Sequence, residues 1–185
     1  MANLYIIAGP NGAGKTTAAM TVLPEILHVK EFVNADEIAR GVSPLNPEGV
    51  AFEAGRIMLR RIDQLIKEQQ NFAIETTLST KSYLSLIREA RGKGYLLTLI
   101  FLWLNDTGLA RERVLKRVSE GGHNIPPDII ERRYSRGMKN LPLFIEQVND
   151  WYVYDNSAGE YELVAKEINK ERIIVNFGIW QKILK

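Results

Sequence analysis

The sequence predicts an α/β protein of three layers, in which a mostly parallel sheet has helices on both faces. Short apolar runs of strand length alternate along the chain with longer segments whose apolar residues recur at helical spacing. Strands that alternate with helices pair in parallel, because each helix carries the chain back across the sheet. The length of 185 residues fits one domain, 1–185.

Composition excludes several classes of protein. With 45% hydrophobic and 25% charged residues the chain is not intrinsically disordered, and a net charge of +2 does not suggest a nucleic-acid binder. The longest apolar stretch, Tyr95–Leu104, is too short to span a membrane, and the first residues lack the features of a signal peptide. The absence of cysteine removes disulfides and zinc–thiolate sites. We therefore expect a cytoplasmic protein without membrane or nucleic-acid partners.

The expected strands are short apolar runs bounded by polar residues or glycine. The first, Leu4–Ala8, ends directly before Gly9, and its length and composition are typical of a buried strand. The other expected strands are Glu31–Ala35, Phe72–Glu75, Leu96–Leu104, Tyr152–Asp155 and Arg172–Asn176.

Four amphipathic segments carry helix-start signals. Their starts are Asn46-Pro47, Ser79 or Thr80, Thr107, and Pro126-Pro127. Gly92 and Gly94 mark the end of the second helix. The apolar tail 173–184 predicts either a docked terminal helix or a contact surface, and we favour docking.

The strongest motif follows the first strand. Residues 9–16 match G-x-x-x-x-G-K-[ST] in full, between a strand and a helix. Glycines let successive N–H groups point at phosphate oxygens, Lys15 reaches toward the β- and γ-phosphates, and Thr16 offers its hydroxyl to magnesium. A dinucleotide fingerprint fits less well, because Thr17 stands where its third glycine belongs. We expect ATP and Mg²⁺ to bind at Gly9, Pro10, Asn11, Gly12, Ala13, Gly14, Lys15, Thr16 and Thr17.

Acidic residues stand at the ends of two later strands. Asp36 follows the second strand, where a carboxylate can take the proton of an acceptor hydroxyl; the alternative is that it caps the next helix. Glu75, followed by Thr76, could hold a substrate hydroxyl or a magnesium-bound water, or it could cap a loop. Asp106 is better explained as a helix cap than as a Walker B aspartate, because no glutamate follows it.

Arginines concentrate in the segment from about 107 to 140. Between Arg111 and Lys139 eight bases face four acids, which gives this segment a net charge of +4 against −2 for the rest. Gly121-Gly122 separates two helices, so the segment resembles a lid that closes over a triphosphate. The alternative is a solvated charged face, but a P-loop needs a source of arginine. His123 in the intervening turn is expected to form loop hydrogen bonds.

Five segments together resemble the zeta toxin-like P-loop kinases, and more closely their short stand-alone branch, often labelled predicted ABC-type ATPase. They are GPNGAGKTT, NADEIARGVSP, FAIETTLS, RVLKRVSEGGHNIPPDIIERRYSRG and VYDNS, in the family's order between residues 4 and 157. The resemblance implies a three-layer P-loop NTPase fold with an arginine-rich helical lid. It also implies an ATP-dependent phosphotransferase whose acceptor is a small-molecule hydroxyl, such as the sugar 3′-hydroxyl of UDP-N-acetylglucosamine. A separate antitoxin protein would be a partner.

The resemblance assigns roles by motif. Lys15 and Thr16 serve ATP and magnesium, Asp36 serves as the base, and Glu75 with Thr76 binds substrate. Arg117 is one lid arginine that stabilises the phosphates; we assign the other to Arg133, with Arg132 and Arg136 as alternatives.

Two other functions remain open at this point. The first is a P-loop ATPase that couples hydrolysis to a protein partner. The second is a nucleotide-dependent binding module, which would not need the acids and arginines. The chain has neither an LSGGQ signature nor an Asp-Glu Walker B pair, so it does not resemble an ABC transporter ATPase.

Overall fold

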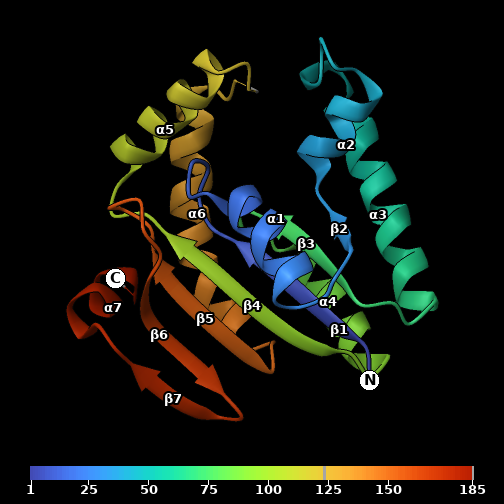
Figure 1. The fold of residues 1–185 in the computed structure, drawn as a ribbon, viewed down its shortest axis with the longest axis vertical. Coiled ribbons are helices and arrows are strands. Elements are labelled where there is room, and N and C mark those ends of the chain that lie inside the picture. Colours follow the sequence, from blue (N-terminus) through green and yellow to red (C-terminus); the bar gives the residue numbers. More distant parts are fainter. Residues whose placement is uncertain (123, 185) are drawn as a thin grey trace.

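The computed structural model describes residues 1–122 and 124–184. These residues form a seven-stranded sheet in the order β2-β3-β1-β4-β5-β6-β7 (Figure 1). The first five strands in chain order pair in parallel, and β6 and β7 are antiparallel to their neighbours. The bounds are β1 (Asn3–Ala8), β2 (Glu31–Val33), β3 (Phe72–Thr76), β4 (Leu96–Trp103), β5 (Asp150–Asp155), β6 (Glu162–Ile168) and β7 (Glu171–Ile174).

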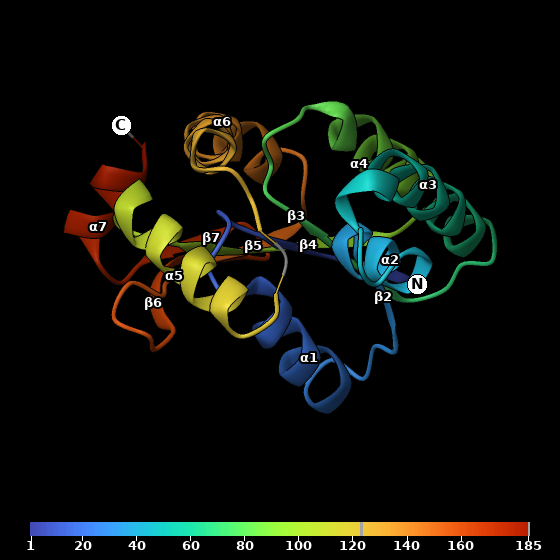
Figure 2. The same cartoon turned by 90° about the horizontal axis from the view of Figure 1, so that it is seen from above.

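Helices cover both faces of the sheet, which confirms the predicted three-layer α/β fold (Figure 2). One face packs against α3 (Ala51–Lys67), α4 (Ser82–Gly92), α6 (Pro127–Ile145) and α7 (Phe177–Leu184). The opposite face packs against α1 (Lys15–Glu25). The remaining helices are α2 (Ala35–Val42), the short 3₁₀ turn η1 (Glu48–Val50) and α5 (Thr107–Ser119). No helix in the described part of the chain is both long and apolar enough to cross a membrane.

The central strand shows why the first apolar run has no polar interruption. In β1, Leu4 and Ile6 are buried under the helices of one face, while Ile7 packs against Ala19 and Leu23 of α1 on the other. A parallel strand buried on both faces reads as a continuous apolar segment. Because β1 ends at Ala8, the residues that follow it lie at the carboxyl edge of the sheet.

The sequence did not predict β6. Only Val164 and Ala165 of this strand are fully buried, and charged residues flank them, so no apolar run marks it. The expected strand 172–176 is β7, which begins one residue earlier and ends at Ile174. Both strands belong to an antiparallel hairpin whose turn residues, Asn169 and Lys170, have φ values of 52° and 69°.

Two helix starts differ from expectation. The helix expected at Ser79 or Thr80 begins at Ser82, whose backbone N–H donates to the Thr80 hydroxyl. Thr107 is not a cap but the first helical residue of α5. Asp106 is the cap, because its carboxylate accepts from Leu109 N at 2.9 Å, and this confirms the interpretation of Asp106 as a helix cap.

The remaining two starts lie at the expected positions or within one residue of them. The expected start at Asn46-Pro47 lies one residue early, because Pro47 itself is the N-cap residue of η1, which leads directly into α3; the Asn46 amide oxygen still accepts from Gly49 N at 3.2 Å. Pro127 is the first residue of α6.

The tail forms a docked helix. Trp180 is only 5% exposed and stacks on Trp151, with ring centroids 5.4 Å apart. Ile183 is buried beside them, so the prediction of docking is confirmed.

Candidate active site

The loop between β1 and α1 has the curled backbone that a phosphate site requires. Gly9, Gly12 and Gly14 have φ values of 144°, 79° and 80°, a region that favours glycine. At Gly9 a β-carbon would also collide with the backbone oxygen of Leu102 in the neighbouring strand. The motif glycines are therefore required by the backbone path, and α1 begins at Lys15 with its N-terminus at the loop.

Lys15 lies inside this loop. Its side chain is 6% exposed, and its Nζ donates to the backbone oxygen of Pro10 at 2.9 Å. Burial lowers the pKa of Lys15, while the charges of Glu75 and Asp36 raise it and that of Arg117 lowers it. The ammonium group is thus held among two carboxylates and a guanidinium, at the point where phosphates are expected.

Glu75, at the end of β3, joins the phosphate loop to β2. One of its oxygens accepts hydrogen bonds from Thr16 Oγ1 at 2.7 Å and from Asn34 Nδ2 at 2.8 Å. The other lies 3.7 Å from Lys15 Nζ. The sequence left open whether Glu75 serves substrate or magnesium; its carboxylate lies beside Thr16, the residue expected to serve magnesium, and also lines the cavity that holds Thr76 and Tyr83.

The Thr16 hydroxyl and the Glu75 carboxylate are hard oxygen donors of the kind that Mg²⁺ prefers. No cluster of three or more His, Cys, Asp or Glu in the described chain could hold a metal by itself. The residues present therefore fit a magnesium ion that takes most of its ligands from nucleotide phosphates and water.

Asp36 lies in the first turn of α2, directly above the phosphate loop. Asn34 caps this helix, because its Oδ1 accepts from Asp36 N at 2.8 Å. The alternative that Asp36 is the cap is therefore wrong. Among the described residues, no hydrogen bond or ion pair involves its carboxylate, which lines three adjoining cavities.

Two of these cavities, which we call the phosphate cavity and the hydroxyl cavity, differ in chemistry. The phosphate cavity, of about 330 Å³, is lined by the phosphate loop together with Arg113 and Arg117. The hydroxyl cavity, of about 200 Å³, is lined by Thr76, Thr77, Ser79, Thr80 and Tyr83, and burial beside Asp36 raises the pKa of Tyr83. Lys15, Asp36 and Glu75 line both cavities.

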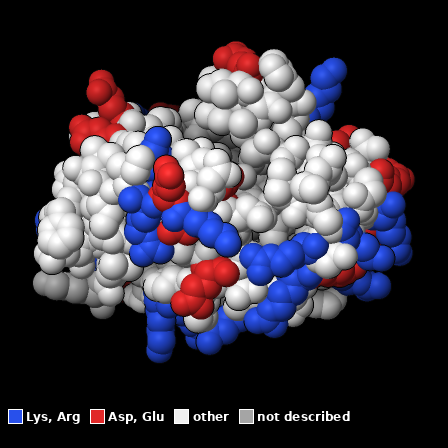
Figure 3. Space-filling view, turned by 90° about the horizontal axis from the view of Figure 1, so that it is seen from below, with Lys and Arg blue, Asp and Glu red and all other residues white. Residues whose placement is uncertain are grey.

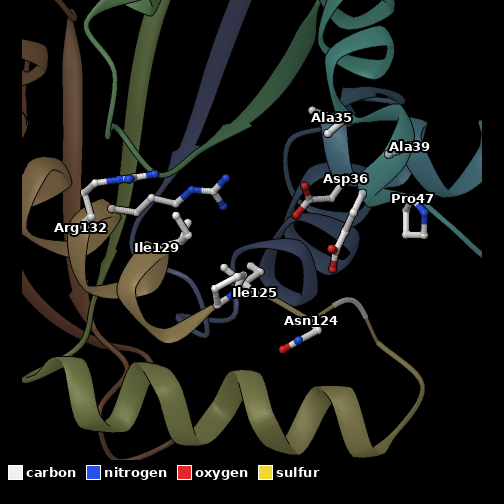
Figure 4. Close-up of a pocket in the computed structure, with 12 residues that line it drawn as sticks. Ala35, Asp36, Ala39, Pro47, Asn124, Ile125, Ile129 and Arg132 are labelled. Atoms are coloured by element: carbon white, nitrogen blue, oxygen red, sulfur yellow. The ribbon is translucent and has the colours of Figure 1, made fainter.

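The lid cavity, of about 380 Å³, lies between α2 and η1 on one side and the arginine-rich segment on the other. Figure 4 shows Asp36 and Ala39 facing Ile129 and Arg132 across it, with Ile125 between the two sides. Its walls are therefore partly apolar and carry opposite charges.

The predicted lid corresponds to α5 and α6, which rise together beyond the carboxyl edge, opposite α2 and α3 (Figure 1). Arg117 lines the phosphate cavity, and Arg133 lines the hydroxyl and lid cavities. Arg132 lines the lid cavity, and Arg136 is not among the lining residues of the three. His123 lies outside the described residues.

A second loop, which follows β5, contacts the phosphate loop. After β5, Asn156 Nδ2 donates to Ala13 O at 3.0 Å, and the Tyr161 hydroxyl donates to Gly14 O at 3.1 Å. Arg113 of α5 donates to Ser157 O at 3.1 Å. These contacts come from a late part of the chain, so no local signal could have revealed them.

Two residues that line the hydroxyl cavity were also missed. Asn34 could have been found, because asparagine directly before a helix is a preferred cap. Tyr83 had no signal, since an aromatic residue in an amphipathic helix is usually core.

Comparison with known proteins identifies the family. Residues 2–164 match the model of the family described as Zeta toxin. The chain belongs to the zeta toxin family. An uncharacterized protein of Haemophilus influenzae is 31% identical over 126 residues, which cover 68% of this chain and 88% of that protein.

Solved structures show the same fold. The AvrRxo1-ORF1:-ORF2 structure with ATP matches with a TM-score of 0.83 and 19% identity, over 100% of this chain and 64% of that chain. A structure of the PezAT chromosomal toxin–antitoxin system of Streptococcus pneumoniae matches with a TM-score of 0.74 and 18% identity, over 99% and 78%. These matches confirm the P-loop fold of this zeta toxin family member, which spans only about two thirds of the AvrRxo1 chain.

Proposed function

We propose that the protein is an ATP-dependent kinase that transfers the γ-phosphoryl group to a hydroxyl of a small molecule. One observation carries the proposal: Lys15, Asp36 and Glu75 line both the phosphate cavity and the hydroxyl cavity. A phosphoryl donor in one cavity and an alcohol in the other would meet at these three residues. Hydrolysis alone would not need a second cavity lined by hydroxyl groups.

The reaction follows from their chemistry. Asp36 accepts the proton of the acceptor hydroxyl, the hydroxyl oxygen forms a bond to the γ-phosphorus, and the bond to the ADP oxygen breaks. Lys15 and Arg117 stabilise the charge on the phosphoryl oxygens. Magnesium, when bound beside Thr16 and Glu75, supplies further neutralisation of the phosphates.

The lid arginines have separate tasks in this proposal. Arg117 of α5 lines the donor side, whereas Arg133 of α6 lines the acceptor side. Closure of the lid segment, about 107–140, toward α2 and η1 would bring both guanidinium groups to the transferring phosphoryl and exclude water.

Family membership makes UDP-N-acetylglucosamine the first acceptor to test. The hydroxyl cavity could take the sugar, and the adjoining lid cavity offers further room. A separate antitoxin protein is the proposed partner, in line with the PezAT system. The proposal treats residues 1–185 as one cytoplasmic kinase domain.

The test is to incubate the protein with ATP, Mg²⁺ and a metabolite extract, and separately with UDP-N-acetylglucosamine. Mass spectrometry should find a product heavier by one phosphate. Hydrolysis that a protein partner stimulates, without such a product, would instead support the coupled ATPase.

Asp36→Asn tests the base. We expect transfer to fall by about 10²- to 10⁴-fold, the usual contribution of a general base, while ATP still binds. Asp63→Asn is the control, because Asp63 lies on the surface in an ion pair with Lys67. Unimpaired transfer by the Asp36 variant would contradict the assignment.

A further inference from the structure

The hydroxyl cavity is lined by alcohol groups that belong to the protein itself. Five side chains with a hydroxyl group line it together with Asp36: Thr76, Thr77, Ser79, Thr80 and Tyr83. The proposed function places the hydroxyl of a small-molecule acceptor in the same cavity. Each of the five groups therefore lies where an acceptor alcohol would bind, and its exposure and hydrogen bonds decide whether it can react.

Two of the five hydroxyls are poorly suited to react. Thr76 is 7% exposed, and its Oγ1 already accepts from Leu78 N at 3.0 Å. The Tyr83 hydroxyl donates to Met58 Sδ at 3.5 Å. Burial, together with the charge of Asp36, raises the pKa of Tyr83, so its phenol holds its proton firmly.

Hydrogen bonds single out Ser79 among the other three. Thr80 Oγ1 shares a hydrogen bond with Ser82 Oγ at 3.0 Å and also accepts from Ser82 N. Thr77 donates its hydroxyl proton to Ser79 Oγ at 2.9 Å. Ser79 is half-buried, and among the described residues its own hydroxyl donates to no group. Its oxygen is thus held in place by Thr77, while its proton remains available to a base.

We propose that Ser79 is phosphorylated by the protein's own kinase reaction, within one molecule, when no small acceptor occupies the hydroxyl cavity. The proposal rests on the proposed function. The Ser79 oxygen forms a bond to the γ-phosphorus, its proton goes to Asp36, and the bond to the ADP oxygen breaks. The products are phosphoserine and ADP.

The loop that carries Ser79 is attached to the lid. Leu78, the residue before it, is fully buried, and its carbonyl accepts from Asn140 Nδ2 of α6 at 2.8 Å. Closure of the lid, as in the proposed function, would carry this loop along with α6. The same motion that brings the lid arginines to the phosphates would therefore also bring Ser79 toward them.

The phosphorylated side chain would remain in the cavity and block it. A phosphoserine carries a charge of about −1.5 to −2 at neutral pH, and Lys15 and Arg133 line the same cavity and would pair with it. The cavity measures only about 200 Å³, so a phosphate bound there leaves little room for an acceptor. The modification would thus stop after one phosphoryl group per chain and inhibit transfer to small molecules.

The test is autophosphorylation, which needs no small-molecule acceptor. The protein is treated with a phosphatase, the phosphatase is removed, and the protein is then incubated with ATP and Mg²⁺ alone. Intact-mass spectrometry should show a gain of one phosphoryl group per chain, and tandem mass spectrometry should place it on Ser79. Because donor and acceptor lie in one molecule, the fraction phosphorylated in a given time should not depend on the protein concentration.

Three variants sharpen the test. Ser79→Ala should abolish the gain while ATP still binds, because Ser79 does not line the phosphate cavity. Ser82→Ala is the matched control, since Ser82 begins α4 three residues later and does not line the hydroxyl cavity, so it should be phosphorylated like the unaltered protein. Asp36→Asn should slow phosphorylation by about 10²- to 10⁴-fold, the usual contribution of a general base.

The outcomes separate this proposal from the kinase function on which it rests. Phosphorylation of another residue, a rate that rises with protein concentration, or an unchanged gain in Ser79→Ala would overturn the proposal. If the chain gains no phosphate but phosphorylates a metabolite, the proposal is wrong and the kinase function stands. If neither the chain nor any metabolite is phosphorylated, both are wrong.

Discussion

Lys15 is an ammonium group inside the protein, and its neighbours decide how firmly it keeps its proton. Burial lowers its pKa, and the carboxylates of Glu75 and Asp36 work against that effect. Nucleotide phosphates would add negative charge at the same place and favour the protonated form further. Glu75 therefore has two roles at once, since it also accepts the hydrogen bond of Thr16.

Glu75→Gln separates the magnesium role from general folding. The change keeps the shape but removes the charge beside Thr16 and Lys15, so the ion should bind less tightly. We expect the Mg²⁺ concentration needed for half-maximal ATP binding to rise about 10- to 100-fold, the range for losing a group that supports a metal ligand. A magnesium titration of ATP binding measures this.

Glu31→Gln is the control for that prediction, because Glu31 pairs with Arg61 at 2.7 Å at the start of β2, away from the loop. An unchanged magnesium requirement in Glu75→Gln would place Glu75 with the acceptor instead, which is the alternative that the sequence left open.

The sequence located Lys15 and Thr16 by the phosphate-loop motif, and Asp36 and Glu75 because they stand at strand ends, which meet at the same edge of a parallel sheet. It could not reveal that Asn34 joins Asp36 to Glu75, because that link depends on the pairing of β2 with β3. Nor could it show that the side-chain oxygen of Asn11 is buried without a hydrogen-bond partner among the described residues, since burial is set by the whole fold.

At the scale of elements, α6 holds the loop that forms the hydroxyl cavity. Asn140 Nδ2 donates to Leu78 O at 2.8 Å, and Gly137 lies against the backbone oxygen of Thr77. Because Leu78 has a φ of 55°, the loop takes a sharp turn at this contact. Helix α6 and the loop at Thr77 and Leu78 are therefore packed together, and separating them would cost free energy.

Gly137→Ala tests this contact. A β-carbon at Gly137 would collide with the Thr77 carbonyl, so we expect the free energy of unfolding to fall by about 1–3 kcal/mol, as in other overpacked sites. Gly55→Ala is matched to it: Gly55 also lies inside a helix, but nothing is within 4 Å of its added β-carbon. That change should raise stability by about 0.5–1 kcal/mol. Urea unfolding measures both, and similar effects from the two changes would refute the close contact.

The sequence predicted strands correctly where most residues are buried, and it missed a strand in which only two residues are buried. β4 is buried over most of its length and was located within a residue or so. β6 has only two buried residues, and its antiparallel position near the edge of the sheet leaves most of the others half-buried. Its pattern cannot be distinguished from a polar loop without its partners β5 and β7.

On the scale of the whole molecule, the arginine-rich segment gathers its charge at the candidate site, whereas charges of both signs mix elsewhere. Each of the three cavities is lined by Asp36 of α2 and, facing it, by arginines of α5 or α6. Figure 1 shows these helices on opposite sides beyond the carboxyl edge of the sheet. Seen from below, from the side where β1 begins, basic and acidic side chains are intermixed (Figure 3). The net charge of +2 is therefore the sum of a basic lid and a mixed remainder.

Helix α7 packs on one face of the sheet beside β6 and α6, and its contribution to stability should be independent of the site. Trp180 is 5% exposed and stacks on Trp151, whereas Phe177 of the same helix is 62% exposed. We expect Trp180→Ala to lower the free energy of unfolding by about 3–5 kcal/mol, and Phe177→Ala by no more than about 0.5 kcal/mol. Urea unfolding monitored by circular dichroism measures both changes. Because α7 lines none of the three cavities, folded Trp180→Ala should bind ATP with unchanged affinity. Weakened ATP binding would mean that α7 and the candidate site are coupled, and equal losses of stability from the two substitutions would contradict the docked helix.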